Sequence, residues 1–205
     1  ASPTVTVTAG TLTVGAIGGS FALTKAGAGT LAISGASTYN GGTTVNAGTL
    51  VYNNNSAFGT GTVTLNGATI KAGTSADWTL ANAINVTATS VVDSTGRNTT
   101  FNGNISGAGN LSLPNSRAPV TVALGGNNSG YTGTFTQPNG VAVNFTSANA
   151  GSAGAAWGFN GGNADRVRVN IAGGGTLNLG SLAGSGPIQN DTASTASVLR
   201  VGALN

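Results

Sequence analysis

Short runs of alternating residues, separated by glycine, most constrain the fold of this chain. In residues 4–15, threonine alternates with valine or leucine, and residues 61–70 and 175–182 show the same pattern. A period of two is typical of β-strands that turn one face inward. Glycine occurs 35 times, and each glycine in a helix interior would cost roughly 1 kcal/mol. We therefore expect an all-β protein of short strands, joined by turns rich in glycine and asparagine.

The same short patterns recur along the chain, which favours a solenoid over a sandwich. Residues 27–35 (GAGTLAISG) resemble residues 107–113 (GAGNLSL), and residues 36–45 resemble residues 127–136. Imperfect repeats of this kind predict coils that stack on one another. We expect a parallel β-solenoid with roughly 20 residues per coil, about nine coils and an axial spacing of about 4.7–4.9 Å.

A longer echo links the two ends of the sequence. Residues 12–17 (LTVGAI) resemble residues 199–204 (LRVGAL). The echo predicts that the chain ends in the phase in which it began, that is, at the same position within the repeated coil. We therefore expect residues 1–205 to form one elongated solenoid unit, either alone or as one unit of a longer tandem or stacked array.

The chain carries few side chains that could perform catalysis. It contains no His, Cys, Met or Glu, and 5% of its residues are charged, against roughly 25% in ordinary soluble domains. Its aspartates are scattered, whereas β-helical lyases and hydrolases need clustered carboxylates, a basic residue or a metal. We expect that the protein is not an enzyme and uses no cofactor, and we predict no catalytic, cofactor-binding or metal-binding residues.

The charged residues suggest few partners. Asp165 lies beside Arg166 and Arg168, but the alternation of arginine with valine favours an exposed strand face over a binding patch. Residues 161–165 (GGNAD) are a fragment of a calcium-binding repeat, with too few oxygen ligands for a site. The net charge is +3 without a run of Lys or Arg, so we expect no nucleic-acid partner. No stretch approaches the roughly 18 apolar residues of a membrane span.

The aromatic residues leave one question open. Tyr39 and Tyr131 occupy equivalent positions in the repeat, before a glycine turn, and we expect them to pack against neighbouring coils rather than to stack on sugars. Trp78 and Trp157 lie in less repetitive segments. Either tryptophan could be exposed, to bind a glycan or a neighbouring subunit, or buried as part of a cap.

Threonine alternation also occurs on ice-binding solenoids, which need one flat face with threonines in register over several coils. Here Thr4, Thr6 and Thr8 lie in one strand, and the adjacent pair Thr43 and Thr44 breaks the alternation. We therefore do not expect an ice-binding face.

Residues 23–50 (LTKAGAGTLAISGASTYNGGTTVNAGTL), followed by residues 57–70 (AFGTGTVTLNGATI), closely resemble the autotransporter-associated β-strand repeat. This is the passenger-associated transport repeat of bacterial autotransporters and large surface proteins. Residues 102–113 and 177–188 resemble flanking coils in such proteins, whereas residues 141–169 match poorly and could bulge or form a loop. The resemblance implies a right-handed parallel β-helix, export to the cell surface, and a stalk or passenger role.

We therefore expect a secreted, extracellular structural protein of a bacterial surface, which acts as a stalk, fibre or filament scaffold. A solenoid leaves unpaired strand edges at both ends, and these pair with whatever continues the sheet. The expected partner is the protein itself, head to tail, in a contact that does not close. The alternative is an adhesin passenger that binds a glycan or a host surface. The predicted stacking interface consists of Val5, Val7, Leu12, Val14, Val198, Leu199, Val201 and Leu204.

Overall fold

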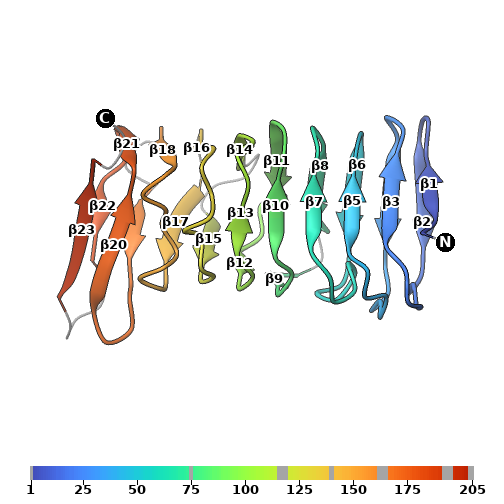
Figure 1. Ribbon diagram of the computed structural model, residues 1–205, viewed down its shortest axis with the longest axis horizontal. Coiled ribbons are helices and arrows are strands. Elements are labelled where there is room, and N and C mark those ends of the chain that lie inside the picture. The colour runs from blue at the N-terminus through green and yellow to red at the C-terminus, as the bar shows by residue number, and fades with distance from the viewer. Residues whose placement is uncertain are drawn as a thin grey trace.

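Every strand pairing is parallel and joins one coil to the next, as the repeats predicted. The computed structural model describes residues 2–73, 76–114, 120–138, 141–160, 166–190 and 196–202. Over those residues it contains strands and turns but no helix. The coils follow one another along a single long axis, with β1 at one end and β23 at the other (Figure 1).

Three sheets form the sides of this solenoid, named here face A, face B and face C. Face A contains β1 (Thr4–Thr6), β3 (Leu23–Ala26), β5 (Thr43–Val45), β7 (Val63–Leu65), β10 (Ile84–Val86) and β13 (Ile105–Ser106). Face B contains β2 (Thr11–Val14), β4 (Thr30–Ile33), β6 (Thr49–Tyr52), β8 (Thr69–Ala72), β11 (Ser90–Asp93), β14 (Leu111–Ser112), β16 (Thr134–Gln137), β18 (Ala156–Phe159) and β21 (Ser181–Gly184). Face C contains β9 (Trp78–Leu80), β12 (Thr99–Phe101), β15 (Val120–Leu124), β17 (Val141–Phe145), β19 (Val167–Val169) and β22 (Ile188–Gln189).

A fourth, two-stranded sheet of β20 (Gly175–Leu179) and β23 (Ser197–Val201) continues face A. Between β13 and β20, two segments occupy this face without forming strands. Asn128, in the first segment, accepts a hydrogen bond from the Ile105 N–H (2.6 Å) and donates its own N–H to Asn149 O (2.7 Å) in the second segment. Gly180, which follows β20, donates its N–H to Ser152 O (2.9 Å) of that second segment. Face A is therefore continuous from β1 to β23.

The register gives the length of each coil. Thr4 pairs with Thr24 in the first coil, whereas Trp157 pairs with Leu182 in a late coil, so the coils lengthen toward the C-terminal end. The nine strands of face B mark nine coils. Both the coil length and the number of coils agree with the expectation for a parallel β-solenoid.

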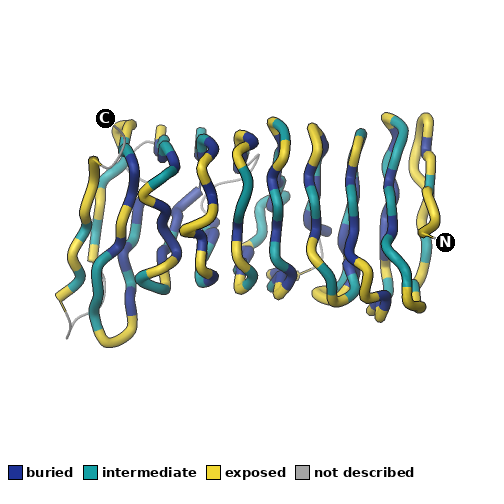
Figure 2. The backbone as a smooth tube through the Cα atoms, in the orientation of Figure 1, coloured by how far each residue is buried: buried dark blue, intermediate teal, exposed yellow. Residues whose placement is uncertain are grey.

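The core consists of inward columns that run through the stack. On face B, Leu31, Leu50 and Ile70 are in register and each is 0% exposed. Figure 2 shows that such buried positions recur in every inner coil, while exposed positions gather at the turns and at both ends. Burial of one such side chain stabilises the fold by about 1.5–3 kcal/mol. The columns therefore hold each coil to its neighbours.

Glycine is required where two coils approach at the corner between faces A and B. Gly27 and Gly48 both have a left-handed backbone, with φ of +78° and +68°. A Cβ on Gly48 would lie less than 3.0 Å from Gly29 O, and one on Gly27 would lie equally close to Val7 O. A side chain at either position would strain the backbone and collide with the preceding coil.

One inward position of face A holds a lysine, which the sequence reasoning missed. Lys25 is in register with Val45 and is 0% exposed. Its Nζ donates hydrogen bonds to the backbone oxygens of Ala26 (2.8 Å), Gly27 (2.7 Å) and Ala47 (3.1 Å). Burial lowers the pKa of the Lys25 amine from its ordinary value of 10.5, while the three carbonyls satisfy all three ammonium protons. Because Ala47 belongs to the following coil, Lys25 ties two corners together.

The aromatic side chains lie inside the solenoid. Tyr39 and Tyr131 are both 0% exposed, which confirms that they pack against neighbouring coils. Trp78 and Trp157 are 6% and 1% exposed, so the question left open by the sequence is answered: both are buried. Phe21 is half-buried and stacks on Tyr39 with ring centroids 6.0 Å apart.

Residues 141–169 continue the solenoid despite their poor match to the repeat. β17 pairs with β15, and β18 pairs with β16. Val167 and Val169 are buried, and Arg168 between them faces outward, as the alternation predicted. The expectation of a bulge or loop is therefore wrong for the described strands of this segment, because Phe145, Trp157 and Phe159 point inward and extend the core. Asp165 lies outside the described residues.

Candidate functional site at the ends of the solenoid

The N-terminal end exposes uncovered strand edges. Within the described residues, β1 pairs only with β3, and β2 pairs only with β4. Leu12 begins an inward column that continues through Leu31 and Leu50. Leu12 is nevertheless 43% exposed, because no coil of this chain covers it. Val5 and Val14 are half-buried at the same end.

Val7 differs from the other predicted interface residues at this end. It is 7% exposed. Its N–H donates to Ala26 O (3.0 Å), and its carbonyl accepts a hydrogen bond from the Gly29 N–H (2.8 Å). Val7 therefore belongs to the contact between the first and second coils rather than to the exposed edge.

The C-terminal end also has open edges. In the part of the chain that the structure describes, β21, β22 and β23 each pair with one strand, on the N-terminal side. Ile188, Val198 and Val201 are 46%, 50% and 48% exposed. Together with Leu12, they are the exposed large hydrophobic residues of the described structure. Exposed apolar surface of this kind therefore gathers at the two ends.

The three described residues of the predicted interface on β23 point in different directions. Leu199 and Val201 are in register with the buried Leu177 and Leu179, so both continue inward columns. Val198 lies between them in the alternation and faces the outer side. A coil stacked on this end would therefore cover Leu199 and Val201 and leave Val198 at the rim.

The structure corrects the predicted phase of the two ends. Leu12 lies on face B, where it pairs with Leu31. Leu199 pairs with Leu177, on the continuation of face A. The two segments of the echo therefore lie on different sides, because coils of unequal length do not keep a constant phase along the sequence. Leu204, also predicted at the interface, lies outside the described residues.

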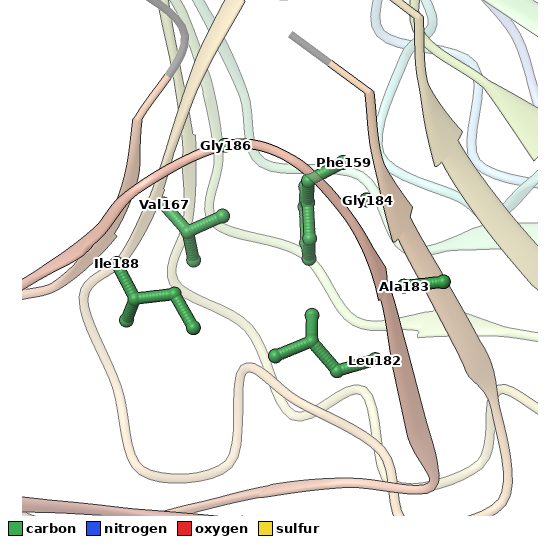
Figure 3. Close-up of a pocket in the computed structure, with 7 residues that line it drawn as sticks. All are labelled: Phe159, Val167, Leu182, Ala183, Gly184, Gly186 and Ile188. Carbon is green, nitrogen blue, oxygen red and sulfur yellow. The ribbon is translucent and has the colours of Figure 1, made fainter. Parts of the chain in front are cut away.

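Beside the C-terminal edges the interior is hollow. Phe159 is in register with Gly184, which contributes no side chain, and a space remains between faces B and C. Figure 3 shows Leu182, Val167 and Ile188 around this space. Its volume is about 190 Å³. Two further hollows, of about 240 and 230 Å³, also border the last described coil. The first space, called the end hollow below, is lined by Phe159, Val167, Leu182, Ala183, Gly184, Gly186 and Ile188.

The side faces carry threonine columns that the sequence reasoning did not foresee. Four threonines are in register on each of two faces, which the alternation within single strands did not reveal. On face B, no second threonine column runs beside the first, because the neighbouring outward positions are Thr13, Ala32, Val51 and Lys71. The columns are Thr4, Thr24, Thr44 and Thr64 on face A, and Thr11, Thr30, Thr49 and Thr69 on face B.

The remaining charged groups are few. Lys71 and Asp93 form an ion pair on the outside of face B, with Nζ and Oδ2 3.4 Å apart. The described residues do not bring three or more His, Cys, Asp or Glu side chains together in a way that could hold a metal ion. None of the helices that a membrane span requires is found among those residues either.

Comparison with known proteins matches one part of the chain. Residues 23–51 match the family model of the passenger-associated transport repeat. No curated protein and no solved structure matches the chain. The matched segment spans β3, β4 and β5 and all but the last residue of β6, so it comprises two stacked strand pairs from faces A and B. The chain is thus a β-solenoid that carries a passenger-associated transport repeat, and it fits an autotransporter passenger repeat protein.

Proposed function

We propose that this chain is a non-enzymatic structural element of a bacterial cell surface, a stalk or fibre scaffold that extends by stacking solenoid ends on one another. One observation carries the proposal: at both ends of the described structure, parallel strand edges without a partner among the described residues occur together with exposed apolar side chains. Such edges template the addition of another strand. The family match supports the surface location, because passenger domains of autotransporters are secreted to the cell surface.

Side-chain ladders between coils support a mechanical role. Asn98 Nδ2 donates to Asp77 Oδ2 (3.0 Å) in the preceding coil, and Asn98 Oδ1 accepts a hydrogen bond from the Thr121 N–H (2.8 Å) in the next. Asn104 Oδ1 accepts one from the Asn127 N–H in the same way (2.8 Å). Because these bonds add to the strand ladders, a pull along the axis is shared by many bonds at each step between coils.

An adhesin that stacks aromatic rings on sugars receives less support. Tyr39, Trp78, Tyr131 and Trp157, on which that alternative depends, are all buried. In the described structure, a glycan would therefore meet hydroxyl and amide groups of the side faces rather than aromatic platforms. The end-to-end proposal uses the surfaces that the structure leaves unpaired.

The experiment that tests the proposal blocks one edge without harming the fold. Val7 N–H bonds to the second coil, and ladder bonds alternate along a strand, so the Thr6 N–H points away from β3. Thr6→Pro removes this outward donor from an edge strand, where proline is tolerated. Thr6→Val is the matched control, because it keeps the N–H.

The wild-type chain and Thr6→Val should elongate as the concentration rises in analytical ultracentrifugation and electron microscopy. Thr6→Pro should stay monomeric, with an unchanged circular dichroism spectrum. A small fraction of Thr6→Pro mixed with wild type should shorten the filaments, because its blocked end stops growth. Wild type that remains monomeric, or equal elongation by both variants, would contradict the proposal.

A further inference from the structure

The described chain crosses face A once more than it crosses face B. Face A begins with β1 and ends with β23, and between them it includes the segments of Asn128 and Asn149. Face B holds nine strands, from β2 to β21. In the described residues β21 and β22 are the last strands on faces B and C. Beyond the described residues, the next position along the spiral therefore lies over β21, not over β23.

This position decides how a second copy can continue the spiral. A copy whose β1 lies over β21 brings its β2 over β22, so the edges of β21 and β22 both gain a strand partner, while residues 15–22 of the copy, which form no strand, lie over β23. If β1 of the copy lay over β23 instead, one layer of the stack would be missing on face B and one on face C. The edges of β21 and β22 would then stay unpaired inside the junction, and buried unpaired backbone groups are rare in native structures.

The side chains at the two ends agree with the first arrangement. The end hollow lies between β21 and β22, with about 190 Å³ of free space above Phe159. Val5, the half-buried centre of β1, supplies an apolar side chain over this space when β1 lies on β21. Leu12 on β2 lies in the same way over Ile188 of β22, and both are exposed in the single chain. β1, β2, β21 and β22 carry no charged residue, so no ion is desolvated on these two faces.

We infer that copies of this chain join with a rotation of about one-third of a turn around the solenoid axis, so that β1 of one copy pairs with β21 of the copy before it. The inference rests on the proposed end-to-end assembly and adds its geometry. Face A of each copy continues face B of the preceding copy, and three copies restore the starting orientation. The threonine columns of faces A and B are then presented in turn on all three sides of the filament.

Cryo-electron microscopy of filaments grown from the 205-residue chain measures this rotation directly. About nine coils at 4.7–4.9 Å give an expected rise of about 45 Å per copy. The expected helical twist is about one-third of a turn per copy. Filaments with a twist near zero per copy would overturn the inference and leave the proposed function intact. A wild-type chain that forms no filaments would contradict the proposed function itself.

Cross-linking gives an independent test, because the chain contains no cysteine. Thr4, Ala183 and Val198 all face outward, on β1, β21 and β23. With a short bismaleimide, Thr4→Cys combined with Ala183→Cys should link filaments into a ladder of covalent oligomers. Thr4→Cys combined with Val198→Cys is the matched control and should give mainly single chains. The reverse result, in filaments of either variant, would show that the copies stack without the rotation.

Discussion

The early and late coils build the same ladder around different cores. On face B, the early coils stack the aliphatic residues Leu31, Leu50 and Ile70. The late coils instead stack Phe135 on Trp157, with ring centroids 4.9 Å apart. The late coils are also longer than the early ones, as the register shows. The repeat family matches the early region only.

The difference teaches that the parallel register, and not a particular side chain, defines this architecture. Where the coil is short, aliphatic columns line face B, beside the aromatic contacts of Tyr52 with Phe58 and Trp78. Where the coil is longer, aromatic rings from several faces meet in the interior, and Trp157 contacts the rings of Tyr131, Phe145 and Phe159. Each region should therefore lose stability through a different kind of substitution.

The largest expected effect comes from the late core. Trp157→Ala removes a ring that several aromatic neighbours share, and we expect a loss of about 4 kcal/mol in the free energy of unfolding. Leu50→Ala in the early core should cost about 3 kcal/mol, because one aliphatic column is interrupted. Urea titration followed by tryptophan fluorescence and circular dichroism measures both. A larger loss from Leu50→Ala would reverse the proposed contrast between the regions.

The second prediction concerns the lysine of the early core. Lys25→Met keeps the apolar stem but leaves the oxygens of Gly27 and Ala47 without the Nζ donor, and we expect a loss of about 2 kcal/mol. Lys71→Met, which breaks an exposed ion pair, is the control and should change stability by less than about 0.5 kcal/mol. Thermal unfolding of both variants makes the comparison. Equal effects would show that the three hydrogen bonds of Lys25 contribute nothing to the folded state.

The smallest expected effect on the free energy of unfolding, counted for each residue, is that of alkaline pH on the buried tyrosines. Burial raises the pKa of Tyr39, Tyr52 and Tyr131 above the ordinary value of 10.0. The folded chain then keeps protons that the unfolded chain loses, so stability is intact below about pH 10 and falls above it. The expected slope is about 1.4 kcal/mol per pH unit for each tyrosine.

Urea unfolding at a series of pH values, with phenolate absorbance as a second signal, tests this dependence. Lys25 acts in the opposite sense, because burial lowers its pKa, but its contribution is constant above about pH 10.5. Tyr52→Phe and Tyr131→Phe should each remove one tyrosine's share of the slope, one from the early coils and one from the late coils. Phenolate absorbance that appears while the chain is still folded would contradict the prediction.

The sequence predicted the fold because alternation and glycine spacing are local signals. It did not reveal the register, and several errors follow from that. The columns of Thr24 and Thr30 become visible only when the coils are aligned. Lys25 lies in the inward phase of its strand, two residues after Leu23, which is a signal that could have been read. The end hollow depends on the pairing of Phe159 with Gly184, and no short sequence pattern encodes that pairing.

The coil length also has a consequence for how the chain folds. Each strand pairs with a segment that lies nearby in the sequence, as Thr4 does with Thr24 and Trp157 does with Leu182. The separation is about a tenth of the chain, which is a relative contact order typical of fast-folding proteins rather than of ordinary β-sheets. Each new coil closes a short loop on a template that already exists, so growth after the first few coils repeats one modest entropic step. This β-protein can therefore fold progressively from one coil to the next, without a search for distant partners.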